Sequence, residues 1–507
     1  MTEPLVPKAT GQPGVLRSAP PEIAVVPGPS WAQMYARHAL SGRPAVVSAG
    51  GTWSFRELTE RAAGWAAWLE AAGLPPGRPV PVLSGGGPSA YALLLAGACT
   101  GRPLALLGSR LTPPEISRCV AVLGTEGPDA GAFIADAAHA ALGREVAVLA
   151  RRRLIILPDP DALGTCELPL DVAASDVAMV LFTSGTTGTP KAVAFGQSRL
   201  GARTRLYADL LDLRADDVFS SSQGFHHLAG AGLLMVALGL GAAVVPPAPR
   251  FTADSWRALA GLGTTHATVA PAMIERLMAA GTLALPGLRM ITYGASPIRP
   301  ATLARLVTHH PSIQLLQGYS QTEGGPITAL TPADHLRAAA GQTRLLASAG
   351  RPVRGTRVVI HDPGADGIGE VWAQADHLAA PRADGWLHTG DMGRLDDGFL
   401  YLSGRQGDMI IRGGENVYPE EVEQRLATHP GVREAAVVGI THEVLGQEIV
   451  AFIVPAEPRN PPGEADLRAY VRAELAGFKV PTQWRVIGEL PRGALGKVLR
   501  RELRLGG

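Results

Sequence analysis

The chain has 507 residues, with 46 basic and 45 acidic side chains and a net charge of +1 at pH 7. A chain of this length exceeds what one hydrophobic core usually serves, so several subdomains are expected. The balanced charge provides no general attraction to nucleic acid, so any anion must be recognised locally.

The first part of the chain predicts an arm followed by a helix-covered sheet. Residues 1–30 are rich in Pro and Gly and lack the basic start and apolar block of a secretory signal, so we expect a loosely ordered arm. Helix-like apolar spacing over 55–72 and 88–98 alternates with short apolar runs over 79–83 and 104–107. Alternating strands and helices are typical of parallel sheets covered by helices.

The three cysteines, Cys99, Cys119 and Cys166, show neither metal-ligand spacing nor a disulfide framework. A reducing, cytoplasmic location fits this pattern best. No nucleic-acid partner is expected.

The segment TSGTTGTPK at 183–191 holds five hydroxyls, two glycines and one lysine after the apolar run 177–182. A turn of this composition can direct backbone N–H groups, hydroxyls and one ammonium at a polyanion. It differs from the familiar P-loop, which needs Ser or Thr directly after its lysine, because Lys191 is followed by Ala192. Composition alone favours a solvated linker; the sequences further along favour a phosphate loop.

The stretch 228–248 is about as long and apolar as a membrane-spanning helix. Its glycines and a Pro-Pro pair instead favour a buried helix over 232–240 and a core strand over 242–245. No membrane span is therefore expected. The strand-and-helix rhythm that starts at 177 predicts a second sheet, with strands at 242–245, 268–270, 290–293 and 314–317.

The remaining chain predicts two smaller units. From 350 to 404 the pattern changes to short strands and turns, which favours a small β-barrel-like subdomain. The last hundred residues indicate a compact α+β unit with a helix at 419–428, strands at 433–440 and 447–455, and a helix at 464–476.

Four further strings follow the phosphate-loop segment: QGYSQTEGG at 317–325, HTGDMGRLDDGFLYLSGR at 388–405, GDMIIRGGENVYPEEVE at 407–423 and LPRGALGKVLRREL at 490–503. In this order the five strings resemble the adenylate-forming superfamily of acyl-CoA synthetases, aryl-acid ligases, luciferases and peptide-synthetase adenylation domains. The resemblance runs from about residue 30 to the C-terminus. It implies an α/β fold with a large N-terminal domain (31–404) of two helix-covered sheets and a small β-barrel subdomain, a hinge (405–409) and a small, mobile α+β lid domain (410–507).

The resemblance also implies ATP, Mg²⁺ and CoA as ligands. The phosphate loop would hold the β- and γ-phosphates through Thr183, Ser184, Gly185, Thr186, Thr187 and Lys191. Thr322 would donate to the α-phosphate, and Glu323 offers a hard oxygen ligand for magnesium. The adenine and ribose would be bound by Tyr319, the turn Gly294-Ala295-Ser296, Asp391 and Arg405. A turn-capping aspartate is the alternative for Asp391.

The lid domain would carry a catalytic lysine, Lys497, which composition alone would assign to the surface. On a mobile lid this cation can bridge the attacking carboxylate and the α-phosphate and then leave. The hinge residue would be Gly407, where most relatives carry Asp or Lys. After rotation, the loop with Gly413 and Gly414 would line a pantetheine tunnel.

The acyl pocket is predicted at HHLAG, 226–230, with His227 as its gate, although His226 is an alternative and a structural histidine is another. Pocket residues would include His227, Ala229, Gly230 and Gly318. The small residues 229–232 leave volume, and no Asp stands nearby to pair with an amine. An apolar acid without an amine is implied, and a bulky one would fit.

Three positions depart from the family pattern: Ala192 and Ser320 replace glycines, and Gly407 replaces a hinge Asp or Lys. Added atoms at the first two positions predict strain or a shifted loop. The leading hypothesis is an acyl-CoA ligase that performs adenylation and thioesterification. The alternatives are transfer to the phosphopantetheine of a carrier protein, an enzyme weak in adenylation that mainly converts a supplied acyl-adenylate, a non-catalytic acyl sensor and a luciferase-like oxygenase.

Overall fold

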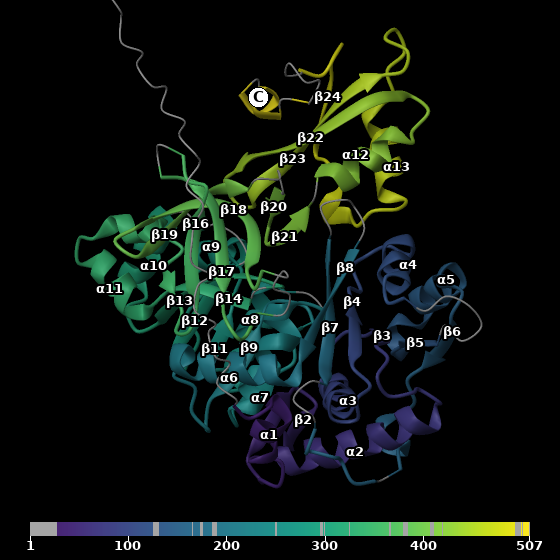
Figure 1. The fold of residues 1–507 in the computed structure, drawn as a ribbon, viewed down its shortest axis with the longest axis vertical. Helices are drawn as coiled ribbons and strands as arrows, with labels where there is room; N and C mark the ends of the chain where they lie inside the picture. The colour runs from purple at the N-terminus through teal and green to yellow at the C-terminus, as the bar shows by residue number, and fades with distance from the viewer. Residues whose placement is uncertain are drawn as a thin grey trace, which may run out of the picture.

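The computed structural model (Figure 1) describes residues 28–124, 131–164, 166–172, 176–184, 190–248, 251–294, 298, 300–323, 325–364, 367–378, 384–405, 410–417, 419–491, 498 and 500–505. It is a mixed α/β structure with a large N-terminal part and a small C-terminal domain at one end. The predicted fold class is confirmed.

A six-stranded sheet occupies the first half of the large domain. Its strand order is β6-β5-β3-β4-β7-β8, with bounds Arg153–Ile156, Ala132–Ala135, Val80–Leu83, Leu104–Leu107, Val177–Ser184 and Pro190–Gly196. The prediction that the strand starting at 177 opens the second sheet is wrong, because β7 pairs in parallel with β4. Strand spacing along a sequence predicts that a strand exists, but it does not identify the neighbour.

A nine-stranded sheet forms the second layer, in the order β15-β14-β13-β12-β11-β9-β10-β1-β2. The bounds are Arg351–Pro352, Gly325–Leu330, Gln314–Gln321, Met290–Gly294, His266–Thr268, Val218–Ser221, Ala243–Val245, Pro44–Ser48 and Gly51–Ser54. The early hairpin β1–β2 therefore belongs to this sheet, through the parallel pairing of β1 with β10.

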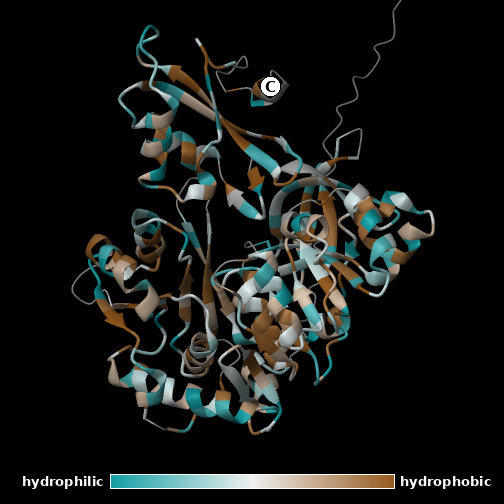
Figure 2. Cartoon of the chain, turned by 180° about the vertical axis from the view of Figure 1, so that it is seen from behind, coloured by the Kyte–Doolittle hydropathy of each residue, from teal (hydrophilic) through white to brown (hydrophobic). Residues whose placement is uncertain are grey.

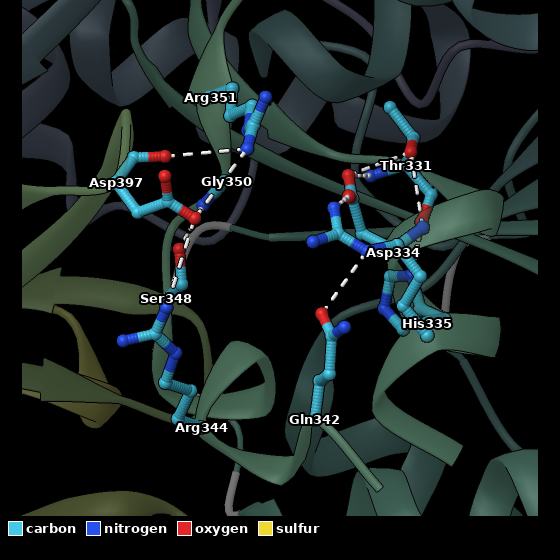
Figure 3. A network of polar contacts seen from close by, with 10 residues as sticks. Thr331, Asp334, His335, Gln342, Arg344, Ser348, Gly350, Arg351 and Asp397 are labelled. Atoms are coloured by element: carbon cyan, nitrogen blue, oxygen red, sulfur yellow. Dashed lines mark hydrogen bonds and ion pairs between the residues drawn. The ribbon is translucent and has the colours of Figure 1, made fainter. Parts of the chain in front are cut away.

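The region predicted as barrel-like is a four-stranded antiparallel sheet, β16-β17-β18-β19, with bounds Arg357–His361, Gly369–Gln374, Leu387–Asp396 and Phe399–Arg405. A network of polar contacts connects this sheet to the nine-stranded sheet (Figure 3). The Ser348 hydroxyl donates to the Leu400 carbonyl at 3.1 Å. It accepts from the Gly350 N–H at 2.8 Å, a contact that Figure 3 shows. A Cβ at Gly350 would lie 2.0 Å from the Ala329 carbonyl carbon, so only glycine fits this approach.

The C-terminal domain is built on a five-stranded sheet of β21-β20-β23-β22 with β24 beside β23. The bounds are Glu415–Val417, Ile410–Arg412, Gly446–Pro455, Val432–His442 and Gln483–Val486. Helices α12 (Pro419–Ala427), α13 (Glu464–Arg472) and α14 (Arg500–Leu505) complete the domain. The predicted α+β unit is confirmed, with α13 four residues shorter than expected.

Helices cover both large sheets, and hydrophobic residues concentrate in the central strands (Figure 2). The helices of the large domain are α1 Trp31–Ala36, α2 Phe55–Ala71, α3 Pro88–Cys99, α4 Pro113–Ala121, α5 Ala140–Ala150, α6 Gln197–Leu211, α7 Leu233–Gly239, α8 Ala253–Gly261, α9 Pro271–Ala279, α10 Pro300–His309 and α11 Pro332–Ala339. Short turns are η1 Ala137–His139, η2 Pro160–Ala162, the π-turn η3 Leu228–Gly232, η4 Thr343–Ala347 and η5 Gly477–Lys479. Capping boxes begin α1, α2, α4, α8 and α11.

The apolar stretch 228–248 folds as η3, α7 and β10 rather than as one long helix. Across the part of the chain that the structure describes, no helix has both the length and the apolar character needed to cross a bilayer.

Candidate active site

The phosphate-loop segment joins two antiparallel strands at the end of the six-stranded sheet. Thr183 on β7 lies opposite Lys191 on β8, and Lys191 is exposed. Gly185, Thr186 and Thr187 lie outside the described residues, as does the side chain of Ser184. The antiparallel pairing of β7 and β8 therefore places Thr183 and Lys191 on neighbouring strands.

Glu323 lies beside the phosphate-loop strand. The Thr183 hydroxyl donates to Glu323 Oε1 at 3.0 Å, which joins residues 140 positions apart. Thr322 and Glu323 follow the end of β13 and are half-buried. A single half-buried carboxylate with one hydroxyl donor leaves oxygen lone pairs for a magnesium ion whose other ligands come from phosphates and water. The donor set therefore fits a phosphate-bound magnesium.

Asp391 on β18 is held by two side chains of the facing strand β13. The Tyr319 hydroxyl donates to Asp391 Oδ2 at 2.6 Å, and Gln321 Nε2 donates to the same oxygen at 2.7 Å. Gln321 Nε2 also contacts the Thr389 carbonyl oxygen at 2.9 Å. Sequence reasoning assigned Tyr319 and Asp391 but missed Gln321, although the residue lies within the string 317–325.

The predicted adenine turn begins where β12 meets β13. Gly294 pairs with Gly318, and a Cβ at Gly294 would lie 2.4 Å from the Gly318 carbonyl oxygen. Ala295 and Ser296 lie outside the described residues. Arg405 pairs with Asp391 across β18 and β19 through the backbone. The structure thus brings Tyr319 and the backbone of Arg405 next to Asp391.

The predicted strain at two departures from the family pattern is not found. Ala192 lies on the exposed face of β8 opposite Phe182, and Ser320 lies at a β-bulge of β13. Neither residue is among the described non-glycine residues with positive φ. Both backbones are therefore accessible to any L-residue. Gly407 lies outside the described residues.

The two adjacent histidines of the predicted acyl gate have different surroundings. The His226 ring packs closely against two glycines. A Cβ added at Gly108 would lie 3.0 Å from this ring, and a Cβ added at Gly224 would lie 2.9 Å from it. His227 Nε2 instead lies 3.8 Å from Glu415 Oε2 of the C-terminal domain. Burial lowers the pKa of both imidazoles, and Glu415 opposes this at His227. This contrast favours His227 over His226 as the residue that faces the site.

The expectation that residues 229–232 leave free volume is wrong at Gly230. A Cβ there would lie 2.0 Å from the Gly224 carbonyl oxygen, so the missing side chain allows backbone to pack against backbone. A Cβ at Gly232 would lie 2.8 Å from Leu228. Gly318 differs, because an added Cβ there meets no heavy atom of the described residues within 4 Å. Ala229 is half-buried.

The hairpin β20–β21 of the C-terminal domain points toward the large domain (Figure 1). Gly413 and Gly414 form its turn with positive φ, and a Cβ at Gly414 would lie 3.3 Å from the Ala270 Cβ. Glu415 Oε1 accepts from Arg110 Nη1 at 2.7 Å. Sequence reasoning named both glycines but missed Glu415 and Arg110, which no local pattern connects.

Lys497 lies outside the described residues. The described residues that flank it, Pro491 and Val498, belong to the C-terminal domain, where Val498 packs against a buried cluster that includes Leu490 and Leu503. Among the described residues, therefore, it is the β20–β21 hairpin that supplies the C-terminal domain's contacts to His227.

Comparisons with known proteins agree with this architecture. A family model described as AMP-binding enzyme matches residues 33–380, and one described as AMP-binding enzyme C-terminal domain matches residues 421–497. The chain is 33% identical over 492 residues to fatty acid–[acyl-carrier-protein] ligase ScoC of Streptomyces coeruleorubidus, covering 91% of this chain and 93% of that protein. It is similar to the amide bond synthetase McbA from Marinactinospora thermotolerans, with a TM-score of 0.82, 28% identity and coverage of 94% and 99%.

Two structures of o-succinylbenzoate CoA synthetase (MenE) from Bacillus subtilis match to different degrees. A double mutant bound with the product analogue OSB-NCoA gives a TM-score of 0.82 at 26% identity. The complex with the acyl-adenylate intermediate OSB-AMP gives 0.66 at 25% identity. Both comparisons cover 94% of this chain and 98% of MenE. The sequence identity and the coverage are nearly the same in the two comparisons, so we attribute the difference in TM-score to the relative arrangement of the domains. In this protein that arrangement is more similar to the one in the product-analogue complex.

Proposed function

This chain belongs to the family of AMP-binding enzymes, and from this premise we propose that it activates an apolar carboxylic acid with ATP and transfers the acyl group to the thiol of CoA. The chain is an adenylate-forming acid–thiol ligase. We propose the class of acid, the thiol acceptor and the roles of the individual residues.

In the first half-reaction a carboxylate oxygen attacks the α-phosphorus, the bond to the β-phosphate oxygen breaks, and pyrophosphate leaves. Lys497 would neutralise charge that builds between the carboxylate and the α-phosphate. Thr322 would donate to an α-phosphate oxygen. Magnesium, when bound beside Glu323, would neutralise phosphate charge, and the Thr183 contact orients that carboxylate.

Ribose recognition would rest on Asp391. Its Oδ2 is occupied by Tyr319 and Gln321 at 2.6 and 2.7 Å. Two donors on one oxygen fix the plane of the carboxylate. A carboxylate fixed in this way is suited to accept hydrogen bonds from two ribose hydroxyls.

In the second half-reaction the thiol loses its proton, sulfur attacks the acyl carbon and AMP leaves with the original carboxylate oxygen. The observation that carries the proposal is the β20–β21 hairpin, which lies against Ala270 and holds Glu415 beside Arg110 and His227. A domain placed in this way is suited to shape a thiol channel at the acyl pocket. The resemblance to the product-analogue complex of MenE supports this interpretation.

An apolar acid is proposed because no carboxylate is present in 226–232 to pair with an amine. Gly318 is proposed to border the acyl group, because no heavy atom of the described residues lies within 4 Å of a Cβ added there. A phosphopantetheine on a carrier protein is the second candidate acceptor, favoured by the likeness to ScoC, whose name specifies an acyl-carrier protein. The backbone conformations of Ala192 and Ser320 provide no support for the hypothesis of weak adenylation, because neither residue has a positive φ.

The test is to incubate the purified protein with ATP, magnesium and a panel of carboxylic acids, in parallel tubes with CoA and with phosphopantetheinylated carrier proteins. Thioester is read by mass spectrometry and AMP by chromatography. We expect acid-dependent AMP and an equal amount of acyl-CoA from an apolar acid. Thioester on the carrier alone would replace the proposed acceptor, and an amino acid or acetate as best substrate would contradict the proposed pocket.

A further inference from the structure

A buried lysine connects the two domains. Lys479 of η5 donates to Glu115 Oε1 of α4 at 2.9 Å and to Glu421 Oε1 of α12 at 3.0 Å. The side chains of Lys479, Glu115 and Glu421 are 6%, 4% and 10% exposed. Glu421 belongs to the same domain as Lys479, whereas Glu115 belongs to the large domain. Only one of the two contacts therefore crosses the interface.

Glu115 is held in place by its own helix. Its second oxygen, Oε2, accepts from the Thr112 backbone N–H at 2.8 Å and from the Thr112 hydroxyl at 2.9 Å, as in a capping box. The Thr112 hydroxyl also contacts the Glu474 carbonyl oxygen of the C-terminal domain. The start of α4 thus presents a rigid carboxylate oxygen to the other domain.

A neighbouring side chain, Arg110, also connects the two domains. Arg110, two residues before Thr112, lies over the Phe478 ring at 5.5 Å and pairs with Glu415 at 2.7 Å. The segment 110–115 therefore meets both η5 and the β20–β21 hairpin that lies beside His227. A displacement of η5 from α4 would also move this hairpin.

The energy of a buried ammonium between two carboxylates depends strongly on where the two carboxylates lie. Burial disfavours the charged ammonium, but Glu421 and Glu115 outweigh it and raise the pKa of Lys479. Removing one partner of such a group leaves buried charge without compensation, whereas replacing the group by apolar side chains can be neutral for stability. A buried pair of this kind is better suited to select one arrangement than to add stability.

We propose that Glu115 and Lys479 are positioning residues that hold the C-terminal domain in the arrangement used for acyl transfer to the thiol. This rests on the proposed function, in which the lid must rotate to bring Lys497 to the site. Rotation breaks the Lys479–Glu115 contact and leaves the Lys479–Glu421 contact intact. The interdomain pair therefore shifts the balance between the two half-reactions without touching either substrate.

The kinetic test compares Glu115→Gln, Lys479→Met and the intradomain control Glu421→Gln. The first half-reaction is measured by acid-dependent exchange of pyrophosphate into ATP, and the second by thioester formed from supplied acyl-adenylate and CoA. For Glu115→Gln we expect the second rate to fall about tenfold, as for one lost charge-assisted hydrogen bond, while exchange is retained. Glu421→Gln should not separate the two rates. Equal losses in both half-reactions, or no loss in either, would overturn the proposal.

A second measurement is independent of activity. Spin labels are placed at the exposed positions Val148 and Val486 in a Cys166→Ser background, and their distance distribution is measured by electron paramagnetic resonance. The background keeps only Cys99 and Cys119, which are buried. We expect Glu115→Gln to broaden or shift the distribution relative to the parent. An unchanged distribution contradicts the positioning role. A shifted distribution in a protein that forms no thioester would contradict the proposed function, and would show only that the pair holds the two domains in this arrangement.

Discussion

At the scale of single residues, the candidate catalytic and binding side chains are oriented by neighbours that the sequence does not identify. Glu323 receives the Thr183 hydroxyl from another sheet, and Asp391 receives Tyr319 and Gln321 from a facing strand. These contacts join residues 140, 72 and 70 positions apart. Their spacing has no local signal, so only the folded chain reveals them.

Replacing Gln321 by Leu should weaken nucleotide binding. The change removes the donor at 2.7 Å from Asp391 and leaves the Tyr319 donor in place. We expect the KM for ATP to rise about tenfold, the usual effect of losing one hydrogen bond to a charged group. Steady-state kinetics with varied ATP check this. An unchanged KM in a protein with the parental melting temperature would contradict the role of Gln321.

His377 should make stability depend on pH. Burial, with Arg203 as a second cause, lowers the pKa of His377 to about 4, and its Nε2 donates to the Pro326 carbonyl oxygen at 2.8 Å. The pKa of His377 is about 6.5 in the unfolded chain, so between this pH and the lower pKa of the folded protein only the unfolded chain binds a proton at His377. The free energy of unfolding therefore keeps its full value above this range and decreases as the pH falls through it. From about pH 7.5 to about pH 5 the loss should be about 2 kcal/mol at most.

The measurement is urea unfolding of the parent and of His377→Gln at both pH values. Glutamine keeps a donor for Pro326 and does not titrate, so its difference between the two pH values should be smaller. The same pH difference in parent and variant would show that His377 is not the group responsible.

At the scale of elements, the sequence predicts strands and helices well and their pairing poorly. Apolar runs located β3, β4, β12 and β13 to within a few residues, because alternation and breakers are local properties. The assignment of β7 to the wrong sheet and the false volume at Gly230 share one cause, since both depend on which distant segment lies alongside. The family resemblance predicted the overall architecture and the position of the hairpin glycines.

Two paired glycines at β12 and β13 should respond in opposite ways. In Gly294→Ala the Cβ meets the Gly318 carbonyl oxygen at 2.4 Å, so the melting temperature should fall, with a loss of about 1–3 kcal/mol. In Gly318→Val no heavy atom of the described residues lies within 4 Å of the added Cβ, so stability should be kept. The ratio of kcat/KM for bulky to small acids should instead fall about tenfold. An unchanged melting temperature for Gly294→Ala, or an unchanged preference for bulky over small acids in Gly318→Val, would contradict the proposed pocket.

At the scale of the whole molecule, the described arrangement brings the β20–β21 hairpin to the site and matches the product-analogue complex of MenE better than its acyl-adenylate complex. Adenylation would need another arrangement, in which Lys497 replaces the hairpin. The two half-reactions should therefore depend on different faces of one domain.

Replacing Lys497 by Ala should slow acyl-adenylate formation on the order of a hundredfold or more, as expected when a stabiliser of transition-state charge is removed. Thioester formation from supplied acyl-adenylate should be largely retained, and Lys497→Arg should keep part of the first rate. Rapid-quench measurement of each half-reaction checks this. Equal losses in the two steps would exclude a role limited to adenylation.

In the proposed reaction the carboxylate of the substrate attacks the α-phosphorus of ATP, and AMP leaves with one of the carboxylate oxygens. The most direct measurement supplies the acid with both carboxylate oxygens as ¹⁸O, together with ATP, magnesium and CoA, and determines the masses of AMP, pyrophosphate and thioester. We expect one ¹⁸O in AMP, one in the thioester carbonyl and none in pyrophosphate. Unlabelled AMP, or ADP with label in inorganic phosphate, would contradict the proposed reaction.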